Sequence, residues 1–260
     1  MKDIQSLHDS RRIDIRKVGV KAITYPIIVL DKENSTQRTL ARMNMYVNLP
    51  HRFKGTHMSR FVEILHRFHG HFNLKTFRRI LEEMKARLEA EAAHLEMEFP
   101  YFLTNGHSDM PAWLARYECR LHGTLAQSFD LLVEVDVPMP LPNPSFHSPA
   151  ISAGLWGGVT VSVRMKRFLW IEDLIGLAAQ GIGPQTDRPE TVESVCHRVS
   201  GVLQATGSFH WYKVVVKNIV SGYSAFAATE WPAPVSEWAG GLSVDRLFCR
   251  TAENEGYLPS

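Results

Sequence analysis

The sequence predicts an α+β protein in which pairs of long antiparallel strands alternate with pairs of amphipathic helices. The stretch 15–30 is rich in Val and Ile, and 38–50 follows it after the polar turn 31–35, which predicts two long antiparallel strands. Apolar residues then recur at helical spacing in 58–68 and 74–90. A hairpin followed by two helices is therefore expected to open the chain.

The rest of the chain continues this alternation. Strands are predicted over 94–103 and 114–135, separated by the turn residues 105–109. After a Pro-rich loop over 137–149, the expected elements are strand, helix, helix, strand and strand, at 158–168, 170–179, 189–204, 211–219 and 223–230. The same element order thus occurs twice, and we predict two half-modules, 1–136 and 137–260, within one compact domain.

Composition limits the class of protein. The 260 residues are 45% hydrophobic and 22% charged, enough for one large core. A formal charge of +2 gives no support to nucleic-acid binding. The three cysteines, Cys119, Cys196 and Cys249, lack CxxC spacing and suit a reducing compartment. No secretory signal or membrane-spanning run is evident, so we expect a cytoplasmic protein with no membrane partner.

The stretch Met45 to Leu65 has the pattern of a ligand site. A Lys-Gly-Thr-His turn separates an alternating strand from an amphipathic helix, which gathers basic and hydroxyl side chains at the start of that helix: Lys54, Thr56, His57 and Arg60. Free N–H groups and the helix dipole favour an anion there, such as a phosphate. The alternative, equally consistent with the spacing, is that Thr56 only caps the helix and the basic groups are solvated.

Six segments lie in order along most of the chain: DIQSLHDSRRIDIRKVGVKAITYPIIVLD, LPHRFKGTHMSRFVEIL, EAAHLEMEFPYF, VTVSVR, FLWIEDLI and WYKVVVKN. Together they closely resemble GTP cyclohydrolase IB, a prokaryotic enzyme family of the folate pathway. The resemblance implies a tunnelling fold (T-fold), whose half-modules close into barrels by oligomerising, so we expect a homo-oligomer, most simply a tetramer. It also implies conversion of GTP to 7,8-dihydroneopterin triphosphate with release of formate.

The metal ligands that the resemblance implies are altered. The family places a Cys and a His in the loop before VTVSVR, and these fall on Leu141 and Ala153. A family Glu after WYKVVVKN falls opposite Val220, and the His that follows it in the family is missing. Because none of these side chains donates to a metal, we predict no catalytic metal. Zinc or manganese held by relocated ligands is the alternative.

Other parts of the implied pocket are retained. The family's purine-anchoring Glu matches Glu193, whose carboxylate would accept from two adjacent N–H groups of a flat heterocycle. The simpler alternative is a first-turn carboxylate favoured by the helix dipole. Cys196 and His197 share helical spacing with Glu193 and form the alternative metal site. His147, in the altered loop, and His57 are the candidate acid–base residues.

Three functions remain open from the sequence. The first is a family-derived pocket that acts on or binds a purine- or pterin-like ligand without the family's metal, in a specialised biosynthetic pathway. The second is an active GTP cyclohydrolase whose metal ligands have moved. The third is a non-catalytic subunit that regulates or pairs with an authentic cyclohydrolase.

Overall fold

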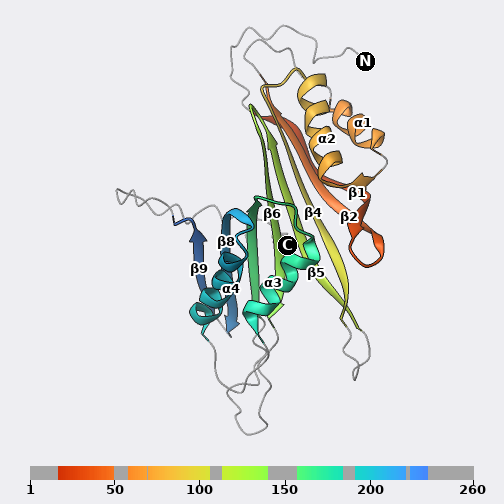
Figure 1. Ribbon diagram of the computed structural model, residues 1–260. Helices are drawn as coiled ribbons and strands as arrows, with labels where there is room; N and C mark the ends of the chain where they lie inside the picture. Colours follow the sequence, from red (N-terminus) through yellow and green to blue (C-terminus); the bar gives the residue numbers. More distant parts are fainter. Residues whose placement is uncertain are drawn as a thin grey trace, which may run out of the picture.

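The computed structural model describes residues 17–49, 58–68, 70–105, 113–139, 157–183, 191–220 and 223–233. They form a nine-stranded sheet in the order β3-β1-β2-β4-β5-β6-β7-β8-β9, in which β1 and β3 are parallel and all other neighbours antiparallel. Two pairs of helices lie on one face of this sheet, as Figure 1 shows. The predicted α+β class is confirmed.

The first half of the chain supplies five strands and one helix pair. Its elements are β1 (Val18–Asp31), β2 (Ser35–Asn48), α1 (Ser59–Arg67), β3 (His71–Phe72), α2 (Leu74–Arg87), β4 (Ala92–Asn105) and β5 (Trp113–Leu125). The hairpin β1–β2 turns over 32–34, where the sequence places its polar turn. Asn73 caps α2, since its side chain accepts a hydrogen bond from the N–H of Thr76 at 2.9 Å.

The second half supplies four strands and the other helix pair. Its elements are β6 (Phe129–Met139), β7 (Gly157–Met165), α3 (Ile171–Ile182), α4 (Val192–Thr206), β8 (Phe209–Val220) and β9 (Tyr223–Trp231). The helix α4 ends at Gly207, which adopts the left-handed conformation with φ 59°. None of the helices in the described residues is long and apolar enough to cross a membrane.

The predicted strand 114–135 is wrong as a single element. The structure divides it into β5 and β6, which pair as a hairpin through the turn 126–128. The turn residues Ala126, Gln127 and Ser128 include neither Gly nor Pro, so this stretch carries no strong turn signal. Residue 136 lies within β6, and the division into half-modules 1–136 and 137–260 stays a prediction.

Alternation along the strands separates two different faces. Met43, Met45 and Val47 of β2 are fully buried beneath the helices, while Asn44 and Tyr46 between them are not. The core is this helix-covered face, continued across β4 to β8. Among the described residues no helix covers the other face, which we call the helix-free face.

A polar network around Arg120 of β5 occupies the centre of the helix-free face. Its guanidinium donates hydrogen bonds to Glu134 and Asp136 of β6, each at 2.5 Å, and lies 3.3 Å from Glu98 of β4. Burial alone would lower the pKa of Arg120, but the contacts with Asp136 and Glu134 outweigh it and raise the pKa. Thr160 donates to Asp136 at 2.6 Å and adds β7 to the network.

A second polar cluster joins the two halves on the helix side. The hydroxyl of Tyr101, on β4, donates to Glu172 of α3 at 2.5 Å, and the N–H of Lys32 in the β1–β2 turn donates to the same carboxylate oxygen at 2.7 Å. The ammonium of Lys32 also pairs with Asp173 at 2.6 Å. These contacts, here called the Tyr101–Glu172 junction, fix the hairpin of the first half against the helix pair of the second.

Candidate functional site

The loops with the altered ligand positions all leave one end of the sheet. Met139 at the end of β6 pairs with Gly157 at the start of β7, and Gly157 in turn pairs with Asn218 of β8. We call this the lower end, after its place in Figure 1. Leu141 and Ala153 belong to the connection between Met139 and Gly157, and both lie outside the described residues, as does His147.

Val220 also lies at the lower end of the sheet. It is the last residue of β8 and pairs with Tyr223 across the β8–β9 hairpin at the lower end. The three altered positions, which are separated in sequence, thus belong to stretches of chain that leave the same end of the sheet. Leu141, Ala153 and Val220, the positions where the family resemblance implies ligands, have only hydrocarbon side chains.

The helix α4 begins toward this lower end. It runs antiparallel to β8, since its last turn leads through Gly207 directly into Phe209 at the opposite end of that strand. Thr191 caps the helix and accepts from the N–H of Ser194 at 3.2 Å. Glu193 is exposed in the first turn, as the family's anchor residue would need to be.

The environment of Glu193 keeps it ionised. A hydrogen bond from its own backbone N–H and a second from the Thr191 side chain lower the pKa of this carboxyl. A carboxylate at a helix N-terminus is also what the simpler alternative requires. The described geometry is therefore compatible with a ligand anchor, and the exposed side chain can reach outward.

Cys196 and His197 point to different sides of α4. Cys196 is buried against β8, with its sulfur 3.8 Å from the carbonyl oxygen of Val214, and this burial raises the pKa of the thiol. His197 is exposed on the outer side. The two side chains do not converge, because consecutive helical residues do not share a face.

The predicted anion site lies at the start of α1. The helix begins at Ser59, with Met58 as its N-cap and no side-chain capping hydrogen bond among the described residues. Arg60 is exposed in the first turn, which contains no acidic residue. Lys54, Thr56 and His57 lie outside the described residues.

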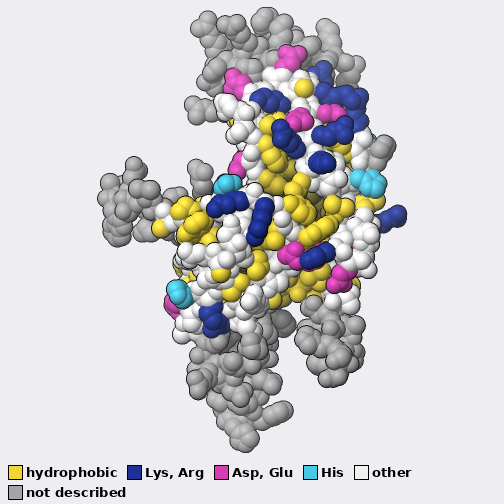
Figure 2. Space-filling view, in the orientation of Figure 1, with side chains coloured by type: hydrophobic (Ala, Val, Ile, Leu, Met, Phe, Trp, Pro, Cys, Tyr) yellow, Lys and Arg dark blue, Asp and Glu magenta, His cyan; other side chains and the backbone are white. Residues whose placement is uncertain are grey.

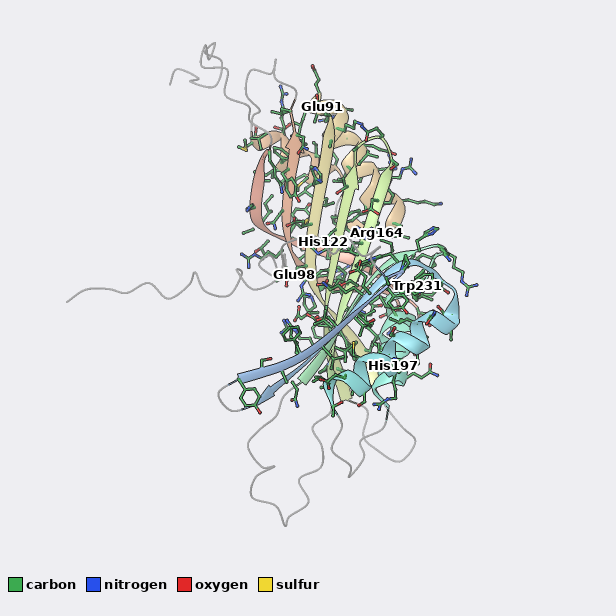
Figure 3. The ribbon with its side chains drawn as sticks, turned by 90° about the vertical axis from the view of Figure 1, so that its left-hand side faces the viewer. Glu91, Glu98, His122, Arg164, His197 and Trp231 are labelled. Carbon is green, nitrogen blue, oxygen red and sulfur yellow. The ribbon has the colours of Figure 1, made fainter. Side chains whose placement is uncertain are left out.

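Arg60 and Glu193 belong to opposite ends of the sheet. The first half places α1 after β2, which ends at Asn48 beside Ala92, at the end where β5 turns into β6. From Phe129 at that upper end, β6 runs ten residues to Met139 at the lower end, about 33 Å. Figure 3 shows Glu91 and His197 near these two ends. One pocket that uses both residues needs two copies of the chain.

Sequence reasoning missed the network around Arg120. Its acidic members Glu134 and Asp136 alternate with the buried Val133 and Val135, a period of two that is visible in the sequence. When 114–135 is predicted as one strand, Arg120 and the two carboxylates lie along the same strand and are not expected to meet. Pairing of β5 with β6 is what places Arg120 between the two carboxylates.

The fold defines the class of protein. Solved uricases share it: the enzyme from Arthrobacter globiformis superposes with a TM-score of 0.54 over 82% of this chain and 91% of its own, at 9% identity. The uricase from Bacillus fastidious gives 0.58 over 82% and 92%, also at 9% identity. This is the tunnelling fold, and identities this low establish the fold alone.

Sequence similarity is far stronger to one family. The model of "Type I GTP cyclohydrolase folE2" matches residues 1–188, so the chain belongs to this family. A protein named GTP cyclohydrolase FolE2 from Syntrophotalea carbinolica is 40% identical over 257 residues, 89% of this chain and 96% of its own. The protein of that name from Syntrophobacter fumaroxidans is 41% identical over 256 residues, 88% and 99%.

The donor chemistry at the lower end does not fit the metal that the family resemblance implies. A divalent metal needs carboxylate, imidazole or thiolate ligands, and Leu141, Ala153 and Val220 supply none. Within the part of the chain that the structure describes, no three His, Cys, Asp or Glu side chains are grouped to hold an ion. We therefore assign no step of the reaction to a metal at these positions.

Proposed function

We propose that this protein acts on GTP as a cyclohydrolase, opening the imidazole ring of the purine and releasing formate. The observation that carries the proposal is continuous similarity to proteins named GTP cyclohydrolase FolE2, at 40–41% identity over 96–99% of their lengths. Similarity of this extent includes both the helix start at Glu193 and the segment around Arg60.

In the proposed site Glu193 holds the purine. Its ionised carboxylate accepts hydrogen bonds from two adjacent N–H groups on the guanine edge, a paired and charge-assisted contact. The triphosphate is bound by Lys54, Thr56, His57 and Arg60, where the α1 N-terminus adds N–H donors. Because Arg60 and Glu193 lie at opposite ends of the sheet, these two groups come from neighbouring copies.

Proton transfer is proposed for two histidines. His147, in the connection that leaves the lower end, is placed by sequence on the purine side, and His57 is on the phosphate side. An imidazole side chain can serve as either acid or base near neutral pH. Hydrolysis of the ring needs both a group that removes a proton from water and one that protonates the departing nitrogen.

The decisive experiment measures formate and 7,8-dihydroneopterin triphosphate released from GTP by the purified protein, together with its zinc and manganese content. Stoichiometric formate supports the proposal, and the metal content then shows whether relocated ligands operate. Absence of formate while GTP still binds would refute ring opening.

The anchoring role of Glu193 has its own test. Replacing Glu193 by Gln retains its size and removes its charge, and a hydrogen bond to a charged group contributes about 1.5–3 kcal/mol. GTP affinity should therefore fall about tenfold or more, as measured by isothermal titration calorimetry. Glu82→Gln, at an exposed helical carboxylate that pairs with Arg78 at 2.8 Å, is the control and should bind GTP like the wild type. Equal binding by Glu193→Gln would show that this carboxylate does not anchor the purine.

A second function is favoured by a specific observation. Three positions that carry ligands in the family resemblance are hydrocarbon side chains here, which suits a protein that holds a purine- or pterin-like ring without opening it. In that case GTP or a pterin binds with Glu193-dependent affinity and no formate appears. The same pair of measurements separates the two functions.

The proposed site requires assembly, and we propose a homotetramer. Within the described residues, the outer edge of β9 has no neighbouring strand, and β3 covers only Ile28 and Val29 of β1. Exposed strand edges pair readily with other strands. Tyr223, at the end of that edge, is 66% exposed in the single chain. Light scattering at micromolar concentration should give four chains, and a stable monomer would refute a site shared between copies.

A further inference from the structure

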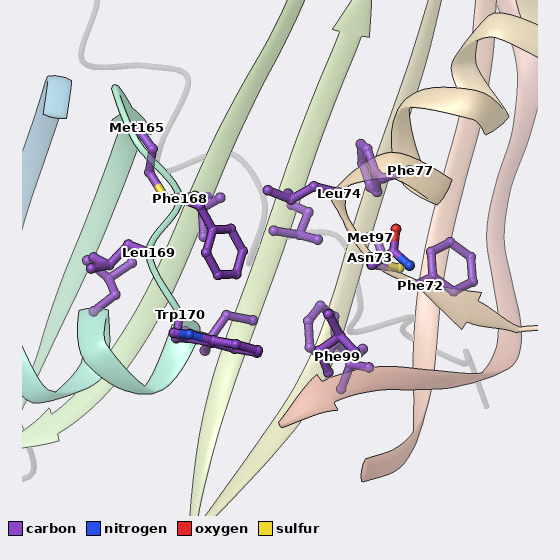
Figure 4. Close-up of a pocket in the computed structure, with 16 residues that line it drawn as sticks. Phe72, Asn73, Leu74, Phe77, Met97, Phe99, Met165, Phe168, Leu169 and Trp170 are labelled. Carbon is purple, nitrogen blue, oxygen red and sulfur yellow. The ribbon is translucent and has the colours of Figure 1, made fainter. Parts of the chain in front are cut away.

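An apolar groove lies between the two helix pairs on the helix side of the sheet. One wall is formed by the segment that leads from β7 into α3, with Phe168 and Trp170, and the other by Phe72, Phe77 and Phe99. Figure 4 shows these two walls facing one another, and Figure 2 shows hydrophobic side chains gathered between the helix pairs. This groove belongs to neither end of the sheet and takes no part in the proposed purine site.

The groove lacks an occupant among the described residues. Phe168 is 54% exposed and Leu30, on the opposite rim, 43% exposed, although both sit beside the core. Its enclosed part measures about 80 Å³, well below the roughly 300–1,000 Å³ of typical small-molecule sites. A space of this size and apolar lining suits a few inserted side chains better than a whole metabolite.

The chain itself carries a segment with suitable side chains. Residues 234–260 follow β9 and contain apolar side chains separated by polar ones: Trp238, Leu242, Val244, Leu247 and Phe248. The alignments with the FolE2 relatives cover 96–99% of those proteins but only 88–89% of this chain, and the family match begins at residue 1. Those alignments leave about a tenth of this chain unmatched, and the segment 234–260 is of comparable length.

The point where the chain leaves the sheet is close to the groove. Trp231 at the end of β9 pairs with Tyr212 of β8, which pairs with Val163 of β7, two residues before Met165 on the groove wall. The ammonium of Lys166 lies 5.7 Å from the centre of the Trp231 ring. The distance from β9 to β7 is two strand spacings, about 10 Å.

The segment is long enough to reach both walls. Five residues separate Ala233 from Trp238, an extended reach of about 17 Å, and fourteen residues separate it from Leu247, about 46 Å. From β7 to β4, which carries Phe99, is a further three strand spacings, about 14 Å. Trp238 can therefore meet the Phe168 wall, and Leu247 and Phe248 the Phe99 wall, without moving the sheet.

We propose that residues 234–260 of this chain dock in the groove between the helix pairs and cover Phe168. Docking removes the aromatic side chains of both partners from water, which is the driving force for such contacts. It adds a contact between the two half-modules.

Limited trypsin digestion of the full-length protein tests this proposal. Arg246 and Arg250 lie within the segment, and cleavage after Arg246 is followed by mass spectrometry. Phe168→Glu places a charge in the groove at an exposed position, so it should release the segment and speed cleavage by about tenfold or more. Leu40→Glu is the matched control, since Leu40 is 59% exposed on the helix-free face, and it should leave the rate unchanged.

A chemical cross-link gives a second and independent measurement. Cys249 directly follows Phe248, so in a Leu30→Cys variant, on the rim opposite Phe168, the introduced thiol should form a disulfide with Cys249 of the same chain on mild oxidation with oxidised glutathione. A Leu40→Cys variant should form no such bond. Equal cleavage at Arg246 in the wild type and in Phe168→Glu, together with no such disulfide, overturns the proposal. A disulfide found only between two chains also overturns it and identifies a second copy as the occupant.

Discussion

The Tyr101–Glu172 junction makes a quantitative prediction about stability. Tyr101 is fully buried, and its hydroxyl donates to Glu172 at 2.5 Å and lies 3.2 Å from the carbonyl oxygen of Leu30. Burial, followed by the hydrogen bond to Glu172, raises the pKa of this phenol, so it stays a neutral donor. Tyr101→Phe removes the donor and changes little else.

The expected cost follows from the charge of the acceptor. A hydrogen bond to a charged group contributes about 1.5–3 kcal/mol, roughly twice the contribution of a neutral one. After the substitution, oxygen Oε1 of Glu172 retains the N–H of Lys32, while Oε2 is buried with no hydrogen-bond partner in the described residues. Because the Glu172 carboxylate would then keep only one of these hydrogen bonds, we expect the free energy of unfolding to fall by about 2–3 kcal/mol, in the upper part of that range.

Urea unfolding at a fixed protein concentration measures this loss, because assembly makes apparent stability concentration-dependent. A double-mutant cycle of Tyr101→Phe with Glu172→Gln should give a coupling energy of at least about 1 kcal/mol. The control, Glu82→Gln, breaks the exposed pair with Arg78 and should cost no more than about 0.5 kcal/mol. A loss below about 0.5 kcal/mol for Tyr101→Phe, with no coupling, would refute the junction as a link between the halves.

Three further predictions concern the fold. Burial alone would raise the pKa of Asp31, but hydrogen bonds from Asn34, Gln37 and Glu33 outweigh it and lower the pKa. The ionised Asp31 carboxylate therefore stabilises the fold above about pH 4, and this contribution is lost as the pH falls. Asp31→Asn should flatten the stability–pH curve in that range, as measured by acid titration followed by circular dichroism. An unchanged acid limb would contradict this. Gly181→Ala would bring a Cβ within 2.5 Å of the Val199 backbone and push α3 away from α4, so the free energy of unfolding in urea should fall by about 1–3 kcal/mol. The control is Gly176→Ala, which has open space around its Cβ and should not destabilise the protein. Burial, aided by the charge of Lys17, lowers the pKa of His94, so the free energy of unfolding should decrease as the pH falls below about 6.5. His94→Gln should abolish this pH dependence. A pH dependence that persists in the variant would show that another group causes it.

Much of the fold was predictable because hydrophobic periodicity is a local property. The alternation in β1 and β2 and the apolar stripe of α2 place those elements within a few residues of their observed bounds. The turn between β5 and β6 was not predictable in this way, since 126–128 carry no Gly or Pro. There the pairing of β5 with β6, which begins at Leu125 and Phe129, decides the conformation, and the turn residues themselves do not signal it.

The candidate site was less predictable, for a physical reason. Sequence identifies Glu193 and Arg60 as residues of suitable chemistry at helix starts, but their separation depends on the register of the strands between them. That register places them at opposite ends of the sheet and on different helix pairs. The groove was missed entirely, because its walls come from segments about one hundred residues apart and none has a distinctive pattern.

The placement of Arg60 and Glu193 at opposite ends has a genetic consequence. Each copy would contribute the phosphate side of one pocket and the purine side of another. An oligomer made only of Arg60→Ala chains, or only of Glu193→Gln chains, would then have a damaged side in every pocket. When the two are co-assembled, some pockets receive both damaged sides and others receive two intact ones. Two inactive alleles would then complement each other inside one oligomer, and the recovered activity would follow the mixing ratio of the chains.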